Sequence, residues 1–203
     1  MDKNRHTTRY KEYDYSKPGF YFITICTHNK KDIFGKIKDI EINDNISEPE
    51  MILNDTGKIV NEEIINAALI RKEIRIDNFV IMPNHIHVIV EILSEEYVGA
   101  NGNSPLSIIT PKNDYKRANC RLPLQNKMKP KSISSFVSGF KASVTRRMKK
   151  ISNDENITIW QRNYFDRIIR NDVELNKIRD YVISNPSNFK NDMENIYDEI
   201  IRL

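Results

Sequence analysis

Runs of apolar and β-branched residues alternate with helical patterns along this chain. Residues 19–27 (GFYFITICT) are dense in aromatic and β-branched side chains, which favours a strand, and we expect this strand at the centre of a sheet. Two weaker strand-like runs follow within residues 34–54, separated by a polar segment, NDNISEP, that is typical of a hairpin loop. Two further apolar runs, residues 73–82 and 86–93, flank a Pro-Asn pair and predict adjacent strands joined by a tight connection.

Two helices are predicted from apolar residues at helical spacing. One begins at Asp55 or Thr56, either of which can cap its first turn, and extends to about Lys72. The other covers residues 132–149, where apolar positions form one stripe and the lysine and arginine residues lie largely off it. One face of this second helix can therefore pack on a sheet while the other face remains available for a charged partner.

A third helix is predicted after an extended segment at residues 157–169. Asn171 can cap this helix, Glu174 takes the capping-box position, and Pro186 is expected to end the helix after Asn185. Most connections between the predicted elements are too short for parallel crossovers. The order of elements therefore predicts an α+β fold, with an antiparallel sheet and helices packed on one face.

Length and composition fit a single domain covering residues 1–203. The chain is 39% apolar, which is enough to bury one core. Between about residues 94 and 131 it is rich in Asn, Pro, Ser, Gly and Lys without a sustained period, which predicts a flexible basic insertion. The start lacks the apolar core of a signal peptide, no apolar run could span a bilayer, and the two cysteines form no disulfide framework. These features predict a cytoplasmic protein with no membrane partner.

Positive charge is concentrated in one part of the sequence. Residues 112–150 contain twelve lysines and arginines and one acid, a net charge of +11, so the remainder carries −7 within a total of +4. Such a stretch suits a polyanion, because each neutralised phosphate releases condensed counterions. Charge alone nevertheless favours a simpler interpretation, a solvated helix face with a lysine-rich linker.

Two histidines stand two positions apart in one predicted strand. Because strand side chains alternate, His85 and His87 project from the same face and can reach one ion, while Ile86 points into apolar packing. By itself such a pair is weak evidence, since buried imidazoles with ordinary hydrogen bonds are commoner than metal ligands. The apolar runs on both sides fix the register, and the Pro-Asn pair places the histidines near a sheet end, where an open metal site is feasible.

Two histidines leave an ion under-coordinated, so a polar side chain, water and substrate oxygens must complete the shell. Asn185 is the candidate, because it stands four residues after Tyr181 and the two side chains share a helix face. Helix geometry alone favours a simpler interpretation of Tyr181. In that interpretation it is a core tyrosine beside the apolar stripe of Leu175, Ile178 and Val182.

Several motifs taken together resemble one protein family. The run VIMPNHIHVIV, the downstream WQRNYFDRIIR and the later LNKIRDYVISNP are similar to the insertion-sequence-200-like transposases, in particular the REP-associated tyrosine transposases. The similarity extends to YDYSKPGFYFITICT and to SSFVSGFKASVTRR, so it covers nearly the whole chain outside the predicted insertion. These transposases are single-tyrosine members of the HUH endonucleases, which are named for histidine, bulky apolar residue, histidine.

The resemblance implies a fold and the roles of four residues. The family fold is a ferredoxin-like antiparallel sheet with helices on one side. His85 and His87 correspond to the metal ligands, Asn185 to the helix residue that contributes to the ion, and Tyr181 to the nucleophile. Tyr164 stands in the prominent WQRNYF segment, but the family's nucleophile precedes the Asn-Pro pair. We therefore assign Trp160, Gln161 and Tyr164 to packing or DNA contact.

The resemblance also implies an activity and its partners. The expected enzyme is a transposase-like endonuclease and strand transferase that cuts and rejoins single-stranded DNA with hairpin structure. The reaction would use Mg²⁺ or Mn²⁺ and a covalent 5′-phosphotyrosine. The basic residues expected to contact the DNA backbone or hairpin stem are Arg146, Arg147, Lys149 and Lys150.

Several alternatives stay open at this point. One is a domesticated module that binds hairpin DNA or RNA and no longer cuts, and another is a metal-dependent hydrolase with no covalent step. The oligomeric state is also open, since the family includes monomers and homodimers with shared active sites.

Overall fold

The computed structural model describes residues 13–43, 46–94 and 131–202, and their side chains except at residues 42–47 and beyond 189. The predicted insertion at 94–131 lies outside these residues almost entirely. In the described part of the chain, four strands form an antiparallel sheet in the order β4-β5-β1-β6. These strands are β1 (Gly19–Cys26), β4 (Ile74–Ile81), β5 (His85–Ile92) and β6 (Phe165–Ile169).

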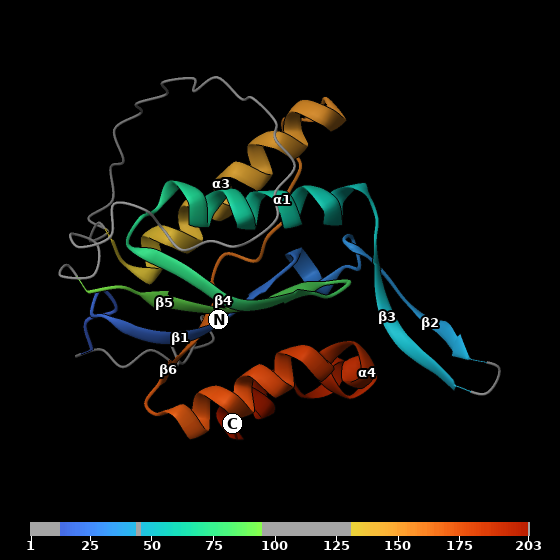
Figure 1. Cartoon of the computed structure of the whole chain (residues 1–203). Helices are drawn as coiled ribbons and strands as arrows, with labels where there is room; N and C mark the ends of the chain where they lie inside the picture. The colour runs from blue at the N-terminus through green and yellow to red at the C-terminus, as the bar shows by residue number, and fades with distance from the viewer. Residues whose placement is uncertain (1–12, 44–45, 95–130, 203) are drawn as a thin grey trace, which may run out of the picture.

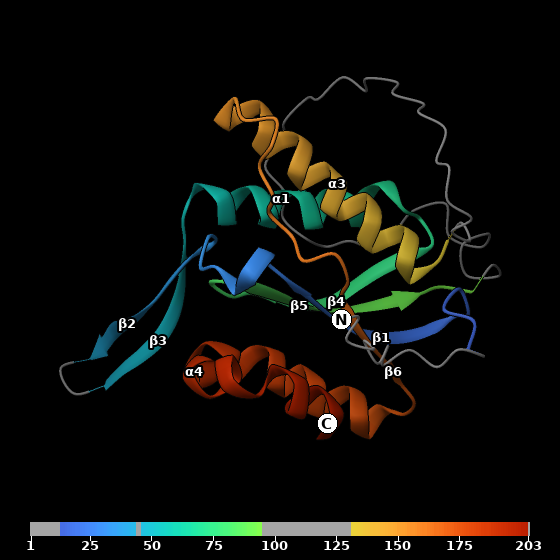
Figure 2. The ribbon, with the colours of Figure 1, turned by 180° about the vertical axis from the view of Figure 1, so that it is seen from behind.

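Three α-helices of the described residues complete the layers. They are α1 (Asp55–Ile70), α3 (Ile133–Ser152) and α4 (Asp172–Arg202). Figures 1 and 2 show α1 and α3 on one face of the sheet and α4 on the other. The remaining strands, β2 (Gly35–Asn43) and β3 (Ile46–Leu53), form a separate hairpin that projects to the side, and the short 3₁₀ helix η1 (His28–Lys30) follows β1.

The predicted α+β class and the antiparallel sheet are confirmed, as is the central position of the first strand. With the β2-β3 hairpin set aside, β1, α1, β4, β5, α3 and β6 follow the β-α-β-β-α-β order of a ferredoxin-like fold. The position of α4 differs from the expectation that all helices pack on one face. It covers the opposite face, because the sheet is apolar on both sides and a second buried face needs a second covering layer.

Alternating side chains supply the two apolar faces. The core under α1 and α3 includes Tyr21, Ile23 and Ile25 of β1 together with Ile86, Val88 and Val90 of β5. The intervening residues Phe22 and Ile89 pack on the other side with Ile169 of β6 and with Leu175, Ile178 and Val182 of α4. Burying each aliphatic side chain of this size contributes about 1.5–3 kcal/mol, so α4 is held as part of the core.

The ends of two helices differ from the predictions. The cap of α1 is Asn54, whose Oδ1 accepts a hydrogen bond from the backbone nitrogen of Gly57 at 2.9 Å, and not Asp55 or Thr56. The prediction that Pro186 ends the last helix is wrong, since α4 continues through it to Arg202. A proline removes one backbone hydrogen bond and presses on the preceding turn, which can bend a helix without ending it.

The start of α4 agrees with its prediction, because Asn171 Oδ1 accepts a hydrogen bond from the backbone nitrogen of Glu174 at 2.9 Å. Of the helices that the structure describes, none combines the length and the apolar content needed to cross a bilayer.

Gly57 allows the first turn of α1 to rest on the loop before β2. A Cβ atom at this position would lie 2.1 Å from the backbone oxygen of Phe34, a contact that only a backbone shift could relieve. Gly139 of α3 is also helical, but the atom nearest to its added Cβ is Nη2 of the Arg71 side chain, at 3.3 Å. The two helical glycines therefore differ in the space around them.

We predict that Gly57→Ala lowers the free energy of unfolding by about 2 kcal/mol, because overpacking against fixed backbone typically destabilises by that amount. Gly139→Ala should leave it unchanged or raise it by up to about 1 kcal/mol, since alanine is the better helix former. Urea unfolding followed by circular dichroism measures both values. Equal effects of the two substitutions would contradict the close approach at Gly57.

Candidate active site

Strand β5 places both histidines on the face covered by α4. His85 and His87 are fully buried, and they alternate with Ile86 and Val88, which face α1 and α3. Their Nε2 atoms lie 3.1 Å apart, and the ring centroids are 4.6 Å apart. The two imidazoles therefore converge on one point through the same kind of nitrogen.

Each imidazole is held from behind by a buried polar side chain. Nδ1 of His85 lies 2.7 Å from Oδ1 of Asn84, and Nδ1 of His87 lies 2.8 Å from Oγ1 of Thr24. An amide oxygen can only accept, so Nδ1 of His85 carries the proton in that contact, and a neutral His85 then has its lone pair on Nε2. The Thr24 hydroxyl can accept a hydrogen bond from Nδ1–H of His87 in the same way, so that the lone pairs of both imidazoles are on Nε2.

Helix α4 brings a phenol to this pair. The hydroxyl oxygen of Tyr181 lies 3.3 Å from Nε2 of His87, and the Tyr181 ring is half-buried. Phe22 supports both groups: its ring stacks on His87 with a centroid distance of 5.2 Å and meets Tyr181 edge-on at 6.0 Å. Tyr181 thus combines the two roles considered for it: its ring packs against the core, and its hydroxyl faces the histidines.

Asn185 lies on the same face of α4 as Tyr181, one turn further along. It is fully buried. One more turn along, the ring of Phe189 stacks on His85 with centroids 6.4 Å apart. Since Tyr181 contacts one imidazole and Phe189 the other, the helix face between them, which carries Asn185, runs over the histidine pair.

The spacing of the two nitrogens allows both to bind one divalent ion. Two nitrogens at about 2.1 Å from a shared ion lie about 3.0 to 3.4 Å apart, depending on the angle between them. Across the described residues, no group of three or more His, Cys, Asp or Glu side chains is arranged to hold a metal. The donor set near the histidines is therefore two imidazoles with polar amide and hydroxyl neighbours, which leaves several positions for water or substrate oxygens.

The four basic residues named from the sequence lie in the other layer. Arg146, Arg147, Lys149 and Lys150 belong to α3, on the face of the sheet opposite to the histidines. Arg147 bridges to α1 by ion pairs with Glu62 and Glu63. Arg146 and Lys150 are exposed, and Lys149 lies 3.6 Å from a carboxylate oxygen of Glu155.

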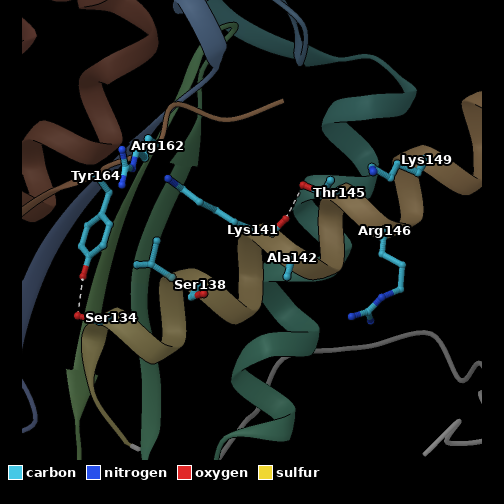
Figure 3. Close-up of a pocket in the computed structure, with 10 residues that line it drawn as sticks. Ser134, Ser138, Lys141, Ala142, Thr145, Arg146, Lys149, Arg162 and Tyr164 are labelled. Carbon is cyan, nitrogen blue, oxygen red and sulfur yellow. Dashed lines mark hydrogen bonds between the residues drawn. The ribbon is translucent and has the colours of Figure 1, made fainter. Parts of the chain in front are cut away.

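Arg146 and Lys149 line an open groove of about 790 Å³ along α3 (Figure 3). Two further cations line it, Lys141 of α3 and Arg162 of the segment before β6, together with the ring of Tyr164. Four basic side chains thus surround one groove, which is a surface suited to an anion.

Lys141 is the most buried of these cations. Its Nζ donates hydrogen bonds to the backbone oxygens of Gln161 at 2.8 Å and Asn163 at 2.9 Å, so it also holds the segment that carries Arg162. Burial lowers the pKa of Lys141 to about 8, because the charged ammonium loses hydration. Lys141 is therefore a cation at neutral pH and loses its charge within the range that proteins tolerate.

Sequence reasoning missed the residues that support the site. Thr24 reaches His87 through the pairing of β1 with β5, and no local motif marks it. Arg162 lies inside the WQRNYF segment, but a single arginine there has no spacing that marks it as part of a site. Asn84 had a usable signal, since it directly precedes the first histidine.

No protein-family model matches the chain. An uncharacterized protein of Haemophilus influenzae is 39% identical to it over 183 residues, which are 90% of this chain and 88% of that protein. Among solved structures, a REP-associated tyrosine transposase bound to a REP hairpin is similar, with a TM-score of 0.49 and 18% identity over 90% of this chain and 74% of that one. A candidate transposase of Deinococcus radiodurans has a TM-score of 0.41 and 12% identity, over 89% of this chain and 98% of the other.

Proposed function

The chain belongs to one family with the uncharacterized Haemophilus influenzae protein, and we propose that it is a single-tyrosine endonuclease and strand transferase for single-stranded DNA. Membership of the REP-associated tyrosine transposases, which the motifs indicate, is part of this proposal. The observation that carries it is the approach of one phenol to two converging imidazoles. Tyr181 Oη lies 3.3 Å from Nε2 of His87, which lies 3.1 Å from Nε2 of His85.

The phenol is the nucleophile in the proposed reaction. The Tyr181 oxygen loses its proton and forms a bond to the scissile phosphorus, the bond from phosphorus to the 3′ oxygen breaks, and that oxygen takes up a proton and leaves as a 3′-hydroxyl. The product is a covalent 5′-phosphotyrosine. Attack by the 3′-hydroxyl of another strand reverses these steps and rejoins DNA, because the energy of the phosphodiester is kept in the linkage.

His85, His87 and Asn185 are the proposed holders of Mg²⁺ or Mn²⁺. Such an ion, when bound, polarises a phosphate and offsets the negative charge that develops on it. Free phenols have a pKa of about 10 and are weak nucleophiles at neutral pH, so this help is needed. Thr24 and Asn84 orient the two imidazoles so that their Nε2 atoms face the same point.

Single-stranded DNA is the proposed substrate because the imidazoles are buried and a cationic groove lies near the edge of the same sheet. His87, Thr24 and Phe165 stand side by side on β5, β1 and β6. Neighbouring strands lie about 4.8 Å apart, so the backbone of Phe165, at the start of β6, lies about 9.6 Å from that of His87. The residue before Phe165 is Tyr164, which lines the groove on α3. A strand of DNA that passes around the β6 edge would contact both layers, with its backbone on Arg146, Lys149 and Arg162.

One prediction from the proposed function concerns the nucleophile. Tyr181→Phe removes the attacking oxygen and keeps the ring packing, so covalent adduct should fall at least about 1000-fold. The assay incubates labelled hairpin-containing single strands with Mn²⁺ and resolves protein-DNA adducts on a denaturing gel. Tyr164→Phe is the matched control, since it keeps the ring that lines the groove and its hydroxyl donates to Oγ of Ser134 in α3, at 3.3 Å, so it should form adduct at the wild-type rate.

Other outcomes of this assay identify the alternatives. Cleavage that forms no adduct, and that the Tyr181→Phe variant retains, would indicate a metal-dependent hydrolase. Binding of the hairpin with no cleavage by the wild-type protein, under any divalent metal tried, would indicate a binding module.

A second prediction concerns the support of His87. Thr24→Val removes the hydroxyl at Nδ1 and preserves the size of the side chain, so Mn²⁺ affinity should fall by about 10-fold or more. Isothermal titration of the protein with Mn²⁺ measures this without any DNA. Thr145→Val is the control, because the Thr145 hydroxyl donates to the backbone oxygen of Lys141 within α3, in the other layer of the fold. Equal affinities in wild type and Thr24→Val would exclude this role of Thr24.

A third prediction uses the lowered pKa of Lys141, which is about 8 because of burial. The side chain is an ammonium at pH 7 and largely a neutral amine at pH 9, so the groove loses one charge over this interval. DNA affinity at low salt should fall with rising pH, and the salt dependence should weaken by about one phosphate contact.

Fluorescence anisotropy with a labelled single strand at pH 7, 8 and 9 measures this change. Lys141→Arg stays charged and should show a flatter profile, whereas Lys58→Arg, at an exposed position of α1, should behave like wild type. Identical profiles for wild type and Lys141→Arg would exclude Lys141 from the DNA surface.

A further inference from the structure

Helix α4 is tied to both edge strands of the sheet by arginine–carboxylate pairs. At the β6 edge, Nε of Arg167 donates to Oε1 of Glu174 in the first turn of α4, at 2.8 Å. At the β4 edge, Arg179 of α4 donates two parallel hydrogen bonds to Asp77, from Nε to Oδ2 at 2.8 Å and from Nη2 to Oδ1 at 2.5 Å. Arg179 lies two residues before Tyr181 in α4, so the Arg179–Asp77 pair holds the turn of the helix that carries the phenol.

A β-bulge presents Asp77 to the helix. Ile76 pairs with Val90 and Asn78 with Ile89, so Asp77 is an extra residue with no partner on β5. A bulge of this kind re-aims a side chain and bends its strand. Here it also keeps the apolar pattern in phase, because Ile76 before it and Phe79 after it both pack in the core under α1 and α3.

The pair supplies what apolar packing lacks. Leu175, Ile178 and Val182 hold α4 to the sheet, but hydrophobic burial is non-directional and tolerates small slides and rotations. A guanidinium and a carboxylate joined by two parallel hydrogen bonds have one preferred geometry. The side chain of Asp77 is only 15% exposed and that of Arg179 37%, so water competes little for the carboxylate.

We propose that Asp77 and Arg179 are positioning residues that set the height and rotation of α4 so that the Tyr181 hydroxyl meets the His85–His87 pair. This proposal rests on the proposed role of Tyr181 as nucleophile. In this proposal the pair acts only through the placement of the helix and needs no contact with DNA or metal. A displacement of the phenol by about 1 Å can lower the rate of chemistry by up to about 100-fold.

The test uses Asp77→Asn, Arg179→Lys and the double variant Asp77→Asn with Arg179→Gln in the full chain. Glu73→Gln is the matched control: Glu73 pairs with Arg71 at 3.6 Å, is 19% exposed like Asp77, and its ion pair does not involve α4. Three quantities are measured for each variant. They are the single-turnover rate of adduct formation at saturating DNA and Mn²⁺, the dissociation constants for DNA and Mn²⁺, and hydrogen exchange of the α4 amides.

The expected result is a rate of adduct formation about 10- to 100-fold lower in each variant, with both dissociation constants within about 2-fold of wild type. The rate of adduct formation should fall no further in the double variant than in Asp77→Asn, because the single and the double variant remove the same interaction. Exchange should quicken in α4 and stay unchanged in β1 and β5. Glu73→Gln should match wild type in all three measurements.

Opposite results overturn the proposal. Rates within 2-fold of wild type, or a fall in rate matched by an equal fall in DNA affinity, would show that the pair does not position the tyrosine. If the wild-type protein forms no adduct, the proposed function fails. Hydrogen exchange then still tests whether the Asp77–Arg179 pair fixes the position of α4. Unchanged α4 exchange in all three variants then overturns it, while faster exchange confined to α4 supports it. Arg179→Lys keeps the charge and serves if Asp77→Asn does not fold.

Discussion

The two-residue repeat of strand β5 determines where chemistry can occur in this fold. Every second side chain, from His85 to Ile89, faces α4, and the residues between them fill the core under α1 and α3. Because both faces are buried, a shift of the strand by one residue would bury the imidazoles among isoleucines and remove them from the tyrosine. The apolar residues that flank the histidines are thus as necessary to the site as the histidines.

The same alternation separates two kinds of surface. The layer of α3 is cationic and open, and it contains the groove near Arg146 and Arg162. The layer of α4 is closed around buried imidazoles and a half-buried phenol. A single sheet separates the cationic groove from the imidazoles and the phenol, and the groove lies next to the β6 edge, since Tyr164 lines it and directly precedes β6.

The sequence was informative wherever a feature depended on local periodicity. The shared face of His85 and His87, the shared helix face of Tyr181 and Asn185, and the cap at Asn171 all follow from spacing within a few residues. Features that depend on the register between distant segments could not be derived this way. Thr24 reaches its histidine across 63 positions of sequence, and Arg179 reaches Asp77 across 102.

Competing interactions explain the remaining differences. Arg147 carries a charge that local reasoning assigned to a polyanion surface, but two glutamates of α1 bind it within the fold. The placement of α4 on the second face follows from the apolar character of both sides of the sheet, which a pattern of single strands does not reveal. Pro186 lies within a helix that packing has already anchored, so the loss of one hydrogen bond does not end it.

The bulge at Asp77 has a consequence for how the gene of such a protein can vary. Two residues, Asp77 and Asn78, separate the inward-facing Ile76 from the inward-facing Phe79. Deleting Asp77 alone would remove the bulge and keep both apolar faces of β4 in register, but the carboxylate that meets Arg179 would be lost; deleting a residue elsewhere in β4 would exchange the two faces of the part that follows. Insertions and deletions should therefore be tolerated in the hairpin of β2 and β3 far more readily than between Ile74 and Ile81, where the number of residues is itself part of the structure.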